Sequence, residues 1–119
     1  MPKAKWYDES YKYYPESAGV VVFYCPGCKG YHYIHTKEKN SSGAMWAFNG
    51  LMDSPTFSPS IHIHYTDYET QEHKTICHSF VRDGQIQYLT DCRHDLKGQT
   101  IDLPDLDEVN YKPQKIKKT

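Results

Sequence analysis

The stretch CHSFVRDGQIQYLTDCRH, residues 77–94, decides the fold that the sequence predicts. Two runs rich in alternating apolar and polar residues flank Asp83-Gly84, and an Asp-Gly pair in this setting is typical of a two-residue β-hairpin turn. With the turn at this pair, Arg82 faces Gln85, and the numbers of cross-strand partners sum to 167, as 82 and 85 do. The stretch therefore predicts two paired antiparallel strands.

This register distributes the hairpin side chains between two faces, because side chains alternate along a strand. Cys77 and Cys92 fall on one face as diagonal neighbours, with Cα atoms about 7–8 Å apart. That separation is long for a disulfide, but two ligands of one metal ion can span it once the strand ends bend. His78 falls on the opposite face with Asp91 as its diagonal neighbour. A histidine beside a carboxylate is either an oriented base or a structural pair, and both interpretations stay open.

A second cysteine pair, Cys25-Pro26-Gly27-Cys28, joins two strand-like runs. Two thiolates in this spacing can bind one tetrahedral ion from a tight turn. A redox C-x-x-C motif normally opens a helix, whereas a strand-like run follows this one. The N-terminus lacks the apolar segment of a secretory signal, so we expect a reducing cytoplasm, where such cysteines hold a metal more often than they form disulfides.

The preferred site is a zinc ion closed by four thiolates, from Cys25, Cys28, Cys77 and Cys92. Four protein ligands leave no position for water or substrate, so this zinc would be structural. His32 and His94 are reserve ligands that could replace a cysteine.

The alternative is an open zinc site with fewer protein ligands, at which the ion could act as a Lewis acid. A small zinc-dependent hydrolase of this kind would use His78, Asp91 and His94. His62 and His64 also share a strand face, but an H-x-H pair is more often an exposed polar surface than a metal site. No neighbouring residue marks Ser58 or Ser60 as an activated nucleophile.

Short β-type runs continue outside the hairpin, and no stretch keeps the apolar spacing of a helix. We expect strands within 19–24, 31–36, 44–48, 60–65 and 99–104. Between them, Pro55 and Pro59 predict an extended, ordered loop over 54–60. The fold class is therefore mostly β: a small zinc-stapled antiparallel β domain built from hairpins, with little helix.

Composition limits the other possibilities. The 119 residues predict an aromatic-rich N-terminal arm at 1–18, a single β-rich zinc-binding domain at 19–109 and a basic flexible tail at 110–119. A net charge of −1 disfavours nucleic-acid binding, and no apolar run is long enough for a membrane span. We expect a cytoplasmic protein that contacts a protein partner.

Several motifs in this order, FYCPGCKGYH, WAFNG, SPTFSPSI, CHSFVRDGQIQYL and DCRHDLKGQTIDLP, carry a resemblance over residues 20–104. They resemble a family of small phage and bacterial proteins of unknown function whose members are often labelled ammonia monooxygenase. The resemblance implies a β-rich metal-binding domain with its shared pattern at Cys25, Cys28, Cys77, His78, Cys92, His94 and 98–100. Related domains stand beside bacterial ubiquitin-like conjugation components, which implies a role in conflict or protein modification. Membrane-type copper or iron oxidation would need spans and histidine clusters that this chain lacks.

The first hypothesis is therefore a non-catalytic, zinc-binding accessory protein of phage or bacteria, a protein-interaction module that would act in the host cytoplasm during phage–host conflict. The second hypothesis is the small zinc-dependent hydrolase. The number of protein ligands around the metal distinguishes the two, because only an open site leaves room for substrate.

Overall fold

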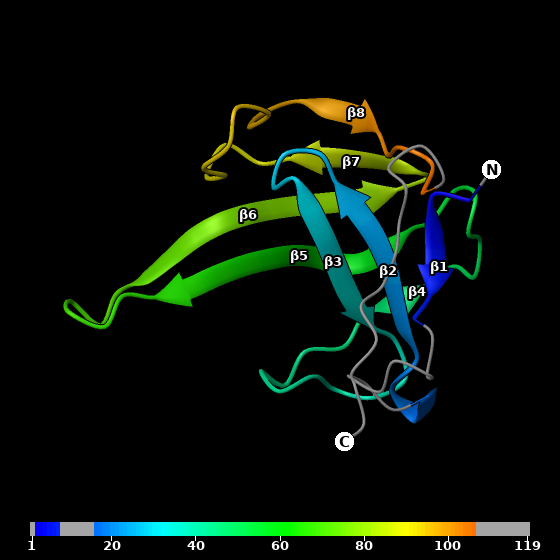
Figure 1. Cartoon of the computed structure of the whole chain (residues 1–119), viewed down its shortest axis with the longest axis horizontal. Coiled ribbons are helices and arrows are strands. Elements are labelled where there is room, and N and C mark those ends of the chain that lie inside the picture. The colour runs from blue at the N-terminus through cyan, green and yellow to red at the C-terminus, as the bar shows by residue number, and fades with distance from the viewer. Residues whose placement is uncertain (1, 8–15, 107–119) are drawn as a thin grey trace, which may run out of the picture.

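The computed structural model describes residues 2–7 and 16–106, and these form two antiparallel sheets (Figure 1). The smaller sheet has the order β1-β2-β3, with β1 at Ala4–Trp6, β2 at Val20–Cys25 and β3 at Gly30–His35. Strand β1 lies inside the segment expected to be an arm and pairs with β2, while the expected tail at 110–119 lies outside the described residues.

The larger sheet contains five strands in sequence order, and the long β5–β6 hairpin extends well beyond the others (Figure 1). These strands are β4 at Ala47–Phe48, β5 at Phe57–Thr66, β6 at His73–Arg82, β7 at Gln85–Tyr88 and β8 at Thr100–Asp102. Among the described residues the single helical element is η2, a 3-10 turn at Glu16–Ala18. The expectation of a mostly β fold with little helix is confirmed.

The predicted hairpin has the predicted register. Asp83 and Gly84 have φ values of 50° and 77°, as a type I′ turn requires at both central positions. From there the pairing runs outward from Arg82↔Gln85 to Ser79↔Tyr88. Strand β7 ends at Tyr88, so the chain leaves the ladder before it reaches Cys92.

The expectation of a loop over 54–60 is partly wrong, because β5 begins at Phe57. The β5–β6 register shifts between Phe57 and Ile61, so Ser58, Pro59 and Ser60 form an irregularity within the strand. Proline lacks an N–H for the ladder, and such an irregularity is where a sheet tolerates it. Ser60 lies within this break.

The core lies between the two sheets. Phe23 of the smaller sheet stacks on Phe57 of the larger, with ring centroids 6.0 Å apart. Both are at most 2% exposed and belong to one buried apolar cluster drawn from both sheets. Burial of these apolar side chains thus stabilises the packing of the two inner faces, and it places Cys25, Cys77 and Cys92 in the layer between the sheets. In the described ranges no helix has the length and apolar character that would let it cross a membrane.

Candidate active site and metal centre

The C-x-x-C segment forms the turn between β2 and β3, as the sequence predicts. Cys25 ends β2, the Cys28 N–H donates to Cys25 Sγ at 3.4 Å, and β3 begins two residues later at Gly30. The Gly27 N–H donates to the Tyr88 hydroxyl at 3.2 Å, and this hydroxyl also lies 3.2 Å from Cys25 Sγ. Tyr88 of the larger sheet therefore holds the turn of the smaller one.

Four possible metal ligands gather in the layer between the sheets. One donor atom from each of Cys25, Cys28, His32 and Cys77 lies within 4.8 Å of the others. The first three come from β2, its turn and β3, while Cys77 comes from β6. The predicted convergence of the C-x-x-C pair with Cys77 is present, and the ligands join the two sheets.

Cys92 lies in a neighbouring group with Cys77 and His94, whose donor atoms are also within 4.8 Å of one another. Its thiol is 3.1 Å from both the backbone N–H and the carbonyl oxygen of His78. His94 packs edge-on against Tyr88, with ring centroids 4.5 Å apart. In the first group His32 thus stands where the sequence placed Cys92, and Cys77 belongs to both groups.

The first group fits a metal ion by its chemistry. The four cysteines form no disulfide, and His32 Nε2 is buried without a hydrogen-bond partner in the described structure. A buried polar atom of this kind is costly unless a ligand satisfies it. Thiolate and imidazole donors suit zinc and other divalent transition metals. The arrangement can therefore bind such an ion.

The electrostatics of the thiols agree with this. A hydrogen bond from the Cys77 thiol, together with the nearby His32, lowers the pKa of Cys25 to about 3, although burial opposes the change. Burial, followed by the charge of Cys25, raises the pKa of Cys28 to about 11. The hydrogen bond to Cys25 and burial raise the pKa of Cys77 above its ordinary value. Without a cation the cluster thus favours one thiolate, and a divalent ion would favour the loss of further protons.

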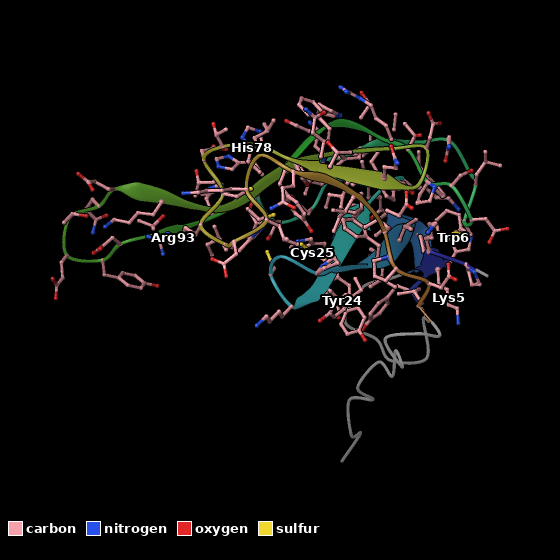
Figure 2. The ribbon with its side chains drawn as sticks, turned by 90° about the horizontal axis from the view of Figure 1, so that it is seen from above. Lys5, Trp6, Tyr24, Cys25, His78 and Arg93 are labelled. Atoms are coloured by element: carbon pink, nitrogen blue, oxygen red, sulfur yellow. The ribbon has the colours of Figure 1, made fainter. Side chains whose placement is uncertain are left out.

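A different constellation lies on the outer face of the larger sheet. His78 Nε2 is 3.2 Å from Ser60 Oγ, and His78 Nδ1 is 3.1 Å from Asp91 Oδ2. The Ser60 side chain is half-buried, and those of His78 and Asp91 are 26% and 49% exposed. Figure 2 shows His78 on the side of the larger sheet away from Cys25. One imidazole thus connects a hydroxyl to a carboxylate.

Neighbouring residues fix this arrangement. Trp46 Nε1–H donates to the main-chain carbonyl oxygen of Ser60 at 3.2 Å. His62 is the cross-strand partner of His78, and their ring centroids are 4.7 Å apart. Burial, then the charges of His78 and His64, lower the pKa of His62. The imidazole of His78 therefore packs against residues of β5.

The sequence predicted the His78–Asp91 pair on the face opposite Cys77, and the structure has it there. It did not find Ser60, whose partner lies eighteen positions away on another strand. The signal that could have found it is strand parity: once His62 pairs with His78, Ser60 shares their face. His94 does not join this group, since its Nε2 is 3.5 Å from the thiol of Cys77 on the inner face.

A serine hydroxyl, an imidazole and a carboxylate linked in this order are the catalytic group of serine hydrolases. The chain belongs to the BubE family, the bacterial ubiquitination-like system serine protease, whose model matches residues 3–89. The match includes Ser60 and His78 and ends two residues before Asp91. No curated protein and no solved structure shows significant similarity to the chain.

The family match corrects four expectations. The resemblance to the phage and bacterial family labelled ammonia monooxygenase is wrong, because the matching family is BubE. The non-catalytic interaction module, expected as a phage accessory protein, is wrong for the same reason, and so is the zinc-dependent hydrolase at His78, Asp91 and His94. A family named as a serine protease indicates an enzyme, where the sequence favoured none.

Proposed function

We propose that the chain is a serine peptidase in which Ser60 is the nucleophile, His78 the general base and Asp91 the residue that orients the base. The observation that carries this is the pair of contacts at His78, 3.2 Å to Ser60 Oγ and 3.1 Å to Asp91 Oδ2. Membership of the BubE family supports it independently. Because the group lies on a partly exposed sheet face, we propose that it acts on an accessible segment of polypeptide.

The geometry supports a double displacement. Ser60 Oγ attacks the scissile carbonyl carbon while His78 Nε2 takes the hydroxyl proton. The C–N bond then breaks, and His78 gives this proton to the departing amine. A water molecule, deprotonated by the same nitrogen, hydrolyses the acyl ester and restores Ser60. Asp91 accepts the Nδ1–H hydrogen bond throughout, which holds the tautomer and stabilises the imidazolium.

We propose that Cys25, Cys28, Cys77 and His32 hold a structural zinc ion. Their donor atoms form one group, whereas the Cys92 thiol already contacts the backbone of His78. The ion would supply no chemistry to the reaction and would hold β6 against the smaller sheet. X-ray absorption of the purified protein should therefore report three sulfur ligands and one nitrogen. Four sulfur ligands would instead favour the all-cysteine site with Cys92.

The nucleophile can be tested without a known substrate. A fluorophosphonate probe reacts with serines activated by an adjacent base. Intact-protein and peptide mass spectrometry should show one probe molecule per chain, attached to Ser60. Ser60→Ala should abolish labelling, while Ser58→Ala, on the same exposed irregularity of β5, should keep it. Labelling that persists in Ser60→Ala, or the lack of any labelling, would refute the assignment.

A further inference from the structure

His62 of β5 lies beside the proposed triad, and the proposed peptidase mechanism does not use it. One donor atom from each of His62, His78 and Asp91 lies within 4.8 Å of the others, so this group meets the same distance limit as the cysteine group. It lies on the outer sheet face, where the His62 side chain is exposed. An ion in solution can therefore reach it.

The donors also indicate the class of ion. Imidazole nitrogens with a carboxylate oxygen suit zinc, nickel and copper, while magnesium and calcium prefer oxygen ligands. Two histidines and one acidic residue form a common three-ligand set for zinc, with water in the remaining position. We therefore consider Zn²⁺ the natural probe and Mg²⁺ its control.

The contacts of His62 suit a ligand. His62 Nε2 is 2.7 Å from the Thr75 hydroxyl. If Nε2–H donates to Thr75, the lone pair is on Nδ1, and metal-bound histidines usually have such an outer contact on the other ring nitrogen. Ligand atoms of one tetrahedral ion are about 3.3 Å apart for bonds of roughly 2.0–2.1 Å. Donors within 4.8 Å need only small side-chain rotations to reach that spacing.

We propose that His62, His78 and Asp91 form an inhibitory site for a divalent transition-metal ion of the zinc type. The inhibition rests on the proposed peptidase function, and its cause is the single lone pair of a neutral imidazole. An ion on His78 Nε2 displaces Ser60. An ion on Nδ1 takes the place of the Asp91 hydrogen bond and leaves Nε2 protonated. In both cases His78 cannot accept the Ser60 proton, so the nucleophile is not activated.

Binding is tested by calorimetric titration of Zn²⁺ into protein that already carries its resident metal. The wild type should bind one further ion. His62→Gln should weaken this binding by about tenfold or more, since even losing an outer contact costs 10–100-fold in affinity. His64→Gln is the matched control, because His64 is also exposed on β5 and lies outside the donor group; it should keep the binding. No second ion in the wild type, or equal binding in His62→Gln, overturns the site.

Inhibition is tested by the rate of fluorophosphonate labelling of Ser60, each variant being compared with its own rate before Zn²⁺ is added. Zn²⁺ should slow labelling in the wild type and in His64→Gln but much less in His62→Gln, and Mg²⁺ should have no effect in any of them. A bound second ion that leaves labelling unchanged overturns the inhibition and leaves the peptidase intact. Conversely, absence of labelling before any addition overturns the peptidase and its inhibition, while calorimetry still decides whether the ion binds.

Discussion

At the scale of the residue, the proposed triad depends on one imidazole with a defined neighbour on each nitrogen. Asp91 contributes the weaker support, because its side chain is 49% exposed and water can compete for its oxygens. A carboxylate at this position still selects the tautomer with a proton on Nδ1. The carboxylate that water can reach is thus also the group that directs the His78 lone pair toward Ser60.

This leads to a prediction for Asp91→Asn. The amide can donate to Nδ1, which favours the tautomer with its proton on the Ser60 side. We expect the labelling rate to fall by about 10²- to 10⁴-fold, with the upper end typical of a fully buried aspartate. Asp95→Asn, an exposed acid in the same loop, is the matched control and should label like the wild type. Similar rates in the two variants would remove Asp91 from the triad.

At the scale of the element, β6 contributes a residue to each of the two proposed sites, one on each of its faces. Cys77 points to the inner layer and His78 to the outer face, as strand alternation requires. The turn at Cys25 to Cys28 completes the inner layer by close contact with the loop after β7. A Cβ at Gly27 would lie 2.2–2.5 Å from three ring atoms of His94, which no real side chain tolerates.

Gly27→Ala should therefore force His94 out of its place. We expect a loss of about 1–3 kcal/mol in the free energy of unfolding, the usual range for overpacking. Gly30→Ala is the matched control, because the nearest atom to its Cβ would be 3.9 Å away, an ordinary contact. It should change stability by no more than about 0.5 kcal/mol. Equilibrium denaturation in urea measures both, and equal stabilities would show that the contact with His94 does not constrain the turn.

Much of the fold and of the candidate site could be predicted from the sequence at the level of single elements. The Asp83-Gly84 turn fixed a register that held from Arg82 to Ser79 and correctly paired His78 with Asp91. Local turn chemistry was sufficient, since each position outward follows from the last. Ser60 could not be found in this way, because its place depends on the irregular pairing of β5 with β6. A register break has no reliable local signal, and Pro59 in the sequence indicated a loop.

At the scale of the whole molecule, the cysteine group joins two sheets that also meet through the apolar core and the Tyr88 hydrogen bond. A small domain buries limited apolar surface, so the proposed metal ion, shared by both layers, would supply a substantial part of its stability. The choice among thiols and imidazoles also belongs to this scale. Sequence spacing identified the C-x-x-C pair and Cys77, but the packing of β3 against β6 decided that His32 would reach the group.

Removal of the metal should affect the whole domain. We expect a strong chelator to lower the melting temperature by about 10 °C or more, because a structural zinc contributes several kcal/mol and each shifts a domain of this size by several degrees. Labelling of Ser60 should slow in parallel, since Cys77 and His78 are adjacent in β6. Restoring Zn²⁺ at one equivalent per chain should recover both. A metal-free protein with unchanged melting and labelling would refute the structural role.

The alternation of Cys77 and His78 also has a consequence for inhibitor profiling of the proposed peptidase. A chelator or a thiol-alkylating reagent would act on the cysteine group at the inner face of β6. The measured effect would nevertheless be a loss of peptidase activity at His78 and Ser60 on the outer face. Profiling by reagent class would therefore group the proposed peptidase with metallopeptidases or cysteine peptidases. Covalent labelling of Ser60 in the fully metallated, reduced protein would instead identify the nucleophile directly, and it would distinguish a serine peptidase from these two classes.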